Sequence, residues 1–201
     1  MYATGNLPDC FQTEHVEFLE RYVVSNYLQQ DCSSVLEIGG GSGAVSTIIQ
    51  ARLLSGSQRN RHVVIQPVDG MYGALEALHL NRIACNSSFE VVDHALSEGE
   101  GVDIERSIGL PEGKGFDCIV VDCEGCLPGE FRKNKELFVN ARQVIVERDD
   151  HEDFDANELP IFLEGERGLY GHLLRVHLGM ELTHTGGGCD GRCVTEVWTR
   201  Y

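Results

Sequence analysis

Hydrophobic positions follow two different spacings along most of this chain. Some segments repeat apolar residues every three or four positions, as amphipathic helices do, and others are short continuous apolar runs, as buried strands are. The first pattern predicts helices over residues 12–30, 44–54, 71–80 and 127–140, and a helical stretch that ends at residue 178. The second predicts strands over residues 35–38, 62–66, 89–92, 116–121 and 143–146.

Strands and helices therefore alternate through the first 150 residues, which favours a parallel sheet covered by helices on both faces. The ending breaks this alternation. Residues 180–185 and 194–201 have strand character and are separated by a predicted turn of three glycines at 186–188 and a short link at 189–193. They predict a hairpin whose last strand runs antiparallel to the first five. We expect one α/β domain over residues 1–201, with a helical segment at 1–32, a ligand-binding core at 33–150 and a helix plus hairpin at 151–201.

The most informative segment joins the first strand to the helix that begins at Ala44. Glu37 is followed by glycines at alternate positions, Gly39, Gly41 and Gly43. A strand that turns through glycines into a helix lets a ligand lie against bare backbone. The looser glycine pattern of dinucleotide folds also fits. However, an acid before the turn would repel a pyrophosphate, whereas it suits S-adenosylmethionine (SAM), which carries an ammonium and a sulfonium group.

Further motifs support the same cofactor. The segments 116–125 (FDCIVVDCEG), 95–98 (ALSE), 64–67 (VIQP) and 144–147 (VIVE) resemble those of FkbM-type methyltransferases, a branch of the class I SAM-dependent family. The resemblance covers roughly residues 33–150. It implies a Rossmann-like class I methyltransferase fold, with a mostly parallel seven-stranded sheet, helices on both faces and a C-terminal antiparallel hairpin. The chain departs from the FkbM pattern at Gln66, where an acid is expected, at Leu127, and in a glycine turn without asparagine.

The resemblance also assigns roles by position. Asp122 is assigned to the SAM ammonium or to a substrate proton, and Glu124 is a candidate base or substrate anchor. The alternatives are a turn-capping role for Asp93 and solvated carboxylates for Asp122 and Glu124. The resemblance also implies which part of SAM the other residues would contact. These are Glu37, Gly39, Gly40, Gly41 and Gly43 for the amino-acid end, Gln66 for the ribose, and Asp93, His94 and Ala95 for adenine.

Two clusters of possible metal ligands are weighed against simpler interpretations. The cysteine pairs Cys123/Cys126 and Cys189/Cys193 could hold zinc, but the long separation between the pairs favours free thiols. An acidic run could bind a cationic substrate or, with Asp122, a divalent ion, although such a run is more often a solvated loop. We therefore predict no metal site. The run consists of Glu147, Asp149, Asp150, His151, Glu152, Asp153 and Asp155.

Composition narrows the classes of function. A formal charge of −16 disfavours nucleic acid as a partner. Neither a membrane span nor a secretory signal is apparent, so we expect a cytosolic protein with reduced cysteines. The leading hypothesis is a SAM-dependent methyltransferase that acts on an oxygen of a small-molecule or glycan-like acceptor. The alternatives are a degenerate methyltransferase fold that binds without turnover, and an NAD-type oxidoreductase.

Overall fold

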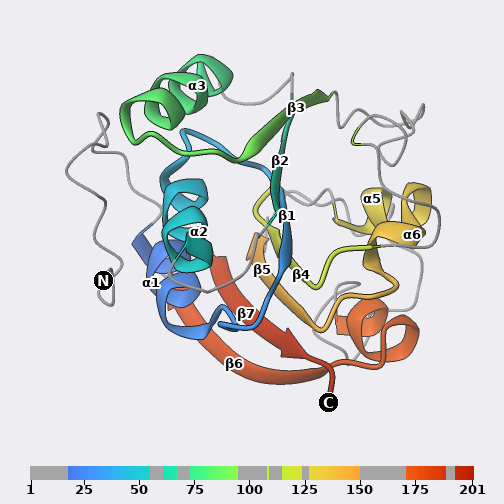
Figure 1. Cartoon of the computed structure of the whole chain (residues 1–201). Coiled ribbons are helices and arrows are strands. Elements are labelled where there is room, and N and C mark those ends of the chain that lie inside the picture. Colours follow the sequence, from blue (N-terminus) through green and yellow to red (C-terminus); the bar gives the residue numbers. More distant parts are fainter. Residues whose placement is uncertain are drawn as a thin grey trace.

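The computed structural model describes residues 18–54, 61–67, 73–94, 108, 115–123, 127–149, 171–188 and 193–201. Seven strands form one sheet in the order β3-β2-β1-β4-β5-β7-β6 (Figure 1). Strands β1 to β5 are parallel, and β7 pairs antiparallel with both β5 and β6. The predicted α/β architecture with its closing hairpin is confirmed. The elements are α1 (Phe18–Tyr27), β1 (Ser34–Ile38), α2 (Ala44–Leu54), β2 (Arg61–Pro67), α3 (Ala74–Ala84), β3 (Glu90–His94), β4 (Cys118–Val121), α5 (Leu127–Lys133), α6 (Lys135–Phe138), β5 (Gln143–Asp149), the π-helix η1 (Leu173–His177), β6 (Glu181–Gly188) and β7 (Cys193–Thr199).

Helices cover both faces of the sheet, with α1 to α3 on one side and α5 and α6 on the other (Figure 1). Alternate strand residues point to opposite faces and are buried on each. This explains why the central strands are apolar almost throughout. One core packs α1 and α2 on the sheet through residues that include Val35, Val120 and Ile145. The other packs α5, α6 and η1 on residues that include Leu36, Ile119 and Val144.

Several predicted boundaries are wrong for local physical reasons. Helix α3 begins at Ala74 rather than at residue 71, and Gly73 before it has a left-handed backbone (φ 82°) that a helix cannot continue through. The predicted helix over 127–140 is divided at Asn134, whose ψ of 42° interrupts the helical backbone. The glycines at 186–188 form no turn. They belong to β6 because β7 pairs with each of them.

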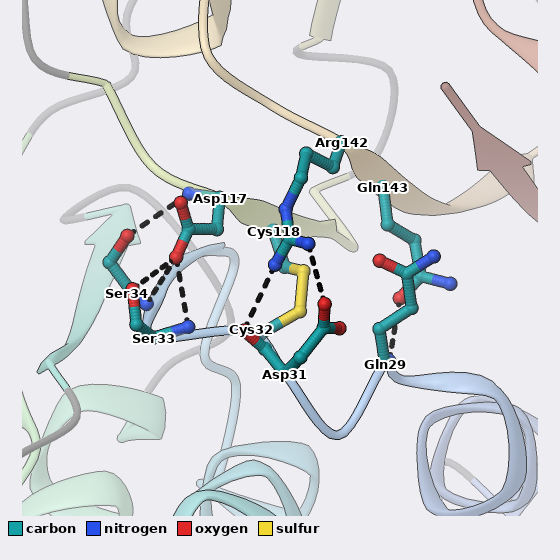
Figure 2. A network of polar contacts seen from close by, with 9 residues as sticks. All are labelled: Gln29, Asp31, Cys32, Ser33, Ser34, Asp117, Cys118, Arg142 and Gln143. Atoms are coloured by element: carbon teal, nitrogen blue, oxygen red, sulfur yellow. Dashed lines mark hydrogen bonds and ion pairs between the residues drawn. A yellow bond between two sulfur atoms is a disulfide. The ribbon is translucent and has the colours of Figure 1, made fainter. Parts of the chain in front are cut away.

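Polar contacts join the connection between α1 and β1 to the amino ends of β4 and β5 (Figure 2). Asp117 accepts hydrogen bonds from the backbone N–H groups of Ser33 and Ser34, at 2.8 and 3.1 Å, and from the Ser33 hydroxyl. In the same place Cys32 and Cys118 form a disulfide. The prediction of free thiols is wrong for Cys118, because the fold brings it together with Cys32, which is far away in the sequence. It is also wrong for Cys85 and Cys123, which are disulfide-bonded too.

Candidate functional site

The sheet has a switch point between β1 and β4. From β1 the chain passes through helix α2 to β2, which lies on one side of β1 in the sheet. After β3 the chain returns to β4, which lies on the other side of β1. Residues just beyond the carboxyl ends of the strands lie together here. The Asp122 N–H donates to the Ile38 carbonyl oxygen at 2.9 Å, and the Gly39 N–H donates to that of Ile65 at 2.9 Å. Open α/β sheets bind their ligands at such a position.

The glycine turn lies at this switch point. Gly39, Gly41 and Gly43 have φ angles of +89°, +49° and +88°, which residues with a side chain rarely adopt. The turn is also tightly packed. A Cβ built on Gly40 would lie 2.4 Å from Val64 Cγ1, and one on Gly43 would lie 2.9 Å from Leu78 Cδ1. The glycines are therefore required by backbone conformation and by packing, whether or not a ligand approaches them.

Glu37 points into the protein, on the face of the sheet that α2 covers. Only 1% of the residue is exposed. Its Oε1 accepts a hydrogen bond of 2.9 Å from the Ser46 hydroxyl, and its Oε2 lies 2.9 Å from Nε2 of His62. Sequence reasoning missed both partners. Ser46 lies nine positions away in the next helix, and the contact with His62 depends on how β1 and β2 align.

The residues expected at the ribose and adenine lie on two neighbouring strands. Gln66 pairs in register with Asp93, and Pro67 pairs with His94. Gln66 is buried, with 3% exposed, and a Cβ on Gly40 would lie 3.3 Å from its Oε1. The structure therefore brings the Gln66 amide to the glycine turn and places Asp93 one strand further away. Ala95 and Glu124 lie outside the described residues, whereas Asp122 is half-buried directly after β4.

The carboxyl end of β5 takes part in two buried polar contacts that the sequence did not indicate. On the face toward α1, burial raises the pKa of Glu20 to about 7, helped by the nearby Glu147 carboxylate, although Glu20 accepts a hydrogen bond of 3.3 Å from Thr195. On the opposite face, Arg148 donates at 2.9 Å to the fully buried carboxylate of Glu196. Both groups lie next to the start of β7.

The metal and zinc alternatives receive no support from the described part of the chain. No group of three or more His, Cys, Asp or Glu side chains there could hold a metal ion. Most of the acidic run, residues 150–155, and Cys126 and Cys189 lie outside that part. Among the described helices, none is long and apolar enough to cross a membrane.

Comparisons with known proteins identify the fold and no family. No family model matches the chain, and no curated protein matches it. Solved structures do. An O-methyltransferase from Bacillus cereus in complex with SAH, the demethylated form of SAM, matches at 20% identity and a TM-score of 0.60, covering 98% of this chain and 86% of that one. A putative O-methyltransferase from Klebsiella pneumoniae matches at 13% identity and a TM-score of 0.59, covering 98% of this chain and 85% of that one.

The O-methyltransferase TomG from Streptomyces achromogenes, solved in complex with SAM, gives 18% identity and a TM-score of 0.58, with 93% and 82% of the two chains covered. Identities this low carry the fold alone. The chain has the Rossmann-like α/β fold of these methyltransferase structures, as the sequence predicted.

Proposed function

We propose that the protein is a SAM-dependent methyltransferase that methylates an oxygen of a small-molecule or glycan-like acceptor. The carrying observation is the glycine turn at the β1/β4 switch point, with the buried Gln66 amide beside it. Two structures with the same fold, those from Bacillus cereus and Streptomyces achromogenes, hold SAH and SAM. An FkbM-like branch and a single domain over residues 1–201 are part of this proposal.

The described residues fit the donor in part. Backbone N–H groups of the glycine turn, residues 39–43, would hold its amino-acid end, and the Gln66 amide offers a hydrogen bond to a ribose hydroxyl. Bound SAM would supply a methyl group already activated by the positive sulfur. The protein then has mainly to hold and orient the acceptor, and a base is needed only if the acceptor must lose a proton. We assign the role of this base, which accepts the proton of the acceptor, to Asp122 or Glu124.

A degenerate fold that binds without turnover is the second candidate. It is favoured by Gln66, which lacks the charge of the expected acid, and by Glu37, whose carboxylate is occupied inside the protein.

The cytosolic location stays a prediction. The Cys32–Cys118 disulfide argues against it, since disulfides persist mainly in oxidising compartments.

Calorimetry with SAM, SAH and NAD⁺ separates these possibilities. We expect SAM and SAH to bind and NAD⁺ not to bind. Replacing Gln66 by Leu, which keeps the size and removes the hydrogen bond, should weaken SAH about tenfold. Mass spectrometry of hydroxyl-bearing acceptors should then show addition of one methyl group. Binding without methylation of any acceptor would favour the degenerate fold, and binding of NAD⁺ alone would contradict the proposal.

A further inference from the structure

A side-chain hydrogen bond closes the base of the glycine turn. Glu37 lies at the end of β1, just before the turn, and Ser46 lies in the first turn of α2, just after it. The 2.9 Å bond from the Ser46 hydroxyl to Glu37 Oε1 therefore joins the two segments from which residues 39–43 emerge. Both residues are buried, with 1% or less exposed.

His62 extends this link to β2. Its Nε2 lies 2.9 Å from Glu37 Oε2, and its ring lies 5.3 Å from that of Phe89, measured between centroids. No described residue forms a hydrogen bond with Nδ1. We therefore assign a proton to Nε2, because the Glu37 carboxylate that it faces can only accept a hydrogen bond. Glu37 then receives one donor from α2 and one from β2.

We propose that Ser46, Glu37 and His62 form a positioning network that holds the glycine turn in its ligand-binding shape, and that Glu37 acts through the turn rather than by touching the ligand. This inference rests on the proposed function. It replaces the expected contact between Glu37 and the SAM ammonium by an indirect role. The burial of Glu37 beneath α2 carries the argument, since the ligand edge of the sheet lies beyond the strand ends.

The chain offers a matched control. Thr47 follows Ser46 and is also buried, but its hydroxyl donates to the Ala44 carbonyl oxygen of its own helix, at 3.0 Å. Ser46→Ala and Thr47→Val each remove one buried hydroxyl from the first turn of α2. Only Ser46→Ala removes a donor from Glu37. His62→Gln, which retains an N–H donor, and His62→Leu, which does not, form a second pair.

Two ligands show which part of the donor the network affects, and Ser46→Ala distinguishes positioning from direct contact. SAH carries an amino group, whereas 5′-methylthioadenosine has the same adenosine and thioether but no amino-acid end. If the network positions the turn, which holds the amino-acid end of the donor, Ser46→Ala and His62→Leu should weaken SAH about tenfold and leave 5′-methylthioadenosine nearly unchanged. If Glu37 instead touched the ammonium group directly, Ser46→Ala would leave the affinity for SAH unchanged, because the carboxylate would still be present. Thr47→Val and His62→Gln should bind as the unmodified protein does. The measurements are made well below the unfolding temperature, so that a purely structural role would leave the dissociation constants unchanged.

The ligand-free protein gives an independent readout. The Gly43 N–H donates to the Gly40 carbonyl oxygen at 2.7 Å within the turn. Its hydrogen exchange, followed by NMR, should accelerate about tenfold in Ser46→Ala and stay unchanged in Thr47→Val. Unchanged exchange and affinity in Ser46→Ala would overturn the inference. So would an equal loss of affinity for SAH and for 5′-methylthioadenosine in Ser46→Ala, because the effect would then lie outside the glycine turn. If neither ligand bound the unmodified protein, the proposed function would fail, while the exchange result would still decide the role of the network.

Discussion

Gly39 lies directly against the backbone of Asp122. A Cβ built on Gly39 would be 1.6 Å from the Asp122 carbonyl oxygen, far closer than two non-bonded atoms can approach. These residues follow β1 and β4, the two strands on either side of the switch point. The closeness of the two strand ends, and with it the shape of the candidate site, thus depends on the absence of one side chain.

Gly39→Ala should consequently destabilise the protein strongly. Gly73 provides the control, because its φ of +82° is similar to the +89° of Gly39, but a Cβ there would meet nothing within 4 Å. Gly73→Ala should cost about 1 kcal/mol for the backbone conformation alone, and Gly39→Ala about 3 kcal/mol or more. Urea unfolding measures both. Equal losses would show that backbone conformation, and not the contact with Asp122, makes glycine necessary.

Stability should fall with rising pH because of Glu20. Burial and the neighbouring Glu147 raise the pKa of Glu20 from 4.5 to about 7 in the folded protein. The folded state then holds this proton more tightly than the unfolded state does. The stabilisation that the tighter binding of this proton gives the folded state is complete below pH 4.5 and is lost as the pH rises through about 7.

The uncharged variant Glu20→Gln isolates this effect from other carboxylates. We expect it to unfold like the unmodified protein at pH 4 and to be more stable at pH 8, by an amount of the order of 3 kcal/mol. In a Glu147→Gln background, the effect of Glu20→Gln on stability at pH 8 should become smaller without disappearing, since burial is the larger cause of the raised pKa of Glu20. Parallel stability curves for the two proteins from pH 4 to pH 8 would contradict a raised pKa.

Asp117 should show the opposite dependence on pH. Burial raises its pKa, but hydrogen bonds from Ser33 and Ser34 and the charge of Arg142 outweigh burial and hold the pKa below its usual 3.8. Its contribution to stability is therefore present above pH 3.8 and is lost as the pH falls further. Asp117→Asn should lower the free energy of unfolding by about 2 kcal/mol at pH 7, with the difference shrinking in acid.

Asp31, in the same network, is the comparison (Figure 2). Its 2.7 Å ion pair with Arg142 is largely exposed, and such pairs contribute little. Asp31→Asn should therefore leave stability at pH 7 nearly unchanged. Similar losses in the two variants would mean that charge near Arg142, rather than the hydrogen bonds to Ser33 and Ser34, accounts for the effect of Asp117.

The Cys32–Cys118 disulfide should make a large contribution, because it closes a loop with a sequence separation of 86. Replacing both cysteines by alanine should lower the free energy of unfolding by about 4 kcal/mol. Alkylation of the unfolded, unreduced protein followed by mass spectrometry shows whether the bond is present. Labelling of both Cys32 and Cys118 without reductant would contradict the disulfide.

Much of the architecture was readable from local patterns. The helix over 44–54 and the first strand were predicted almost to the residue, since continuous apolar runs and helical spacing are properties of adjacent positions. The glycine turn was found in the same way, because alternate glycines between a strand and a helix are typical of a sharp turn with a bare backbone. The boundaries near Gly73 and Asn134 were missed because single backbone conformations, not periodicity, set them.

The sequence by itself determined the alternation of strands and helices, the closing hairpin and the position of the glycine turn, because short-range periodicity encodes each of them. Only the tertiary structure decided that Glu37 faces inward toward Ser46 and His62, that Cys32 meets Cys118, and that Gly39 touches Asp122. Those contacts depend on the register between neighbouring strands and on how the helices and loops pack on the sheet, and the packing of the whole core fixes both.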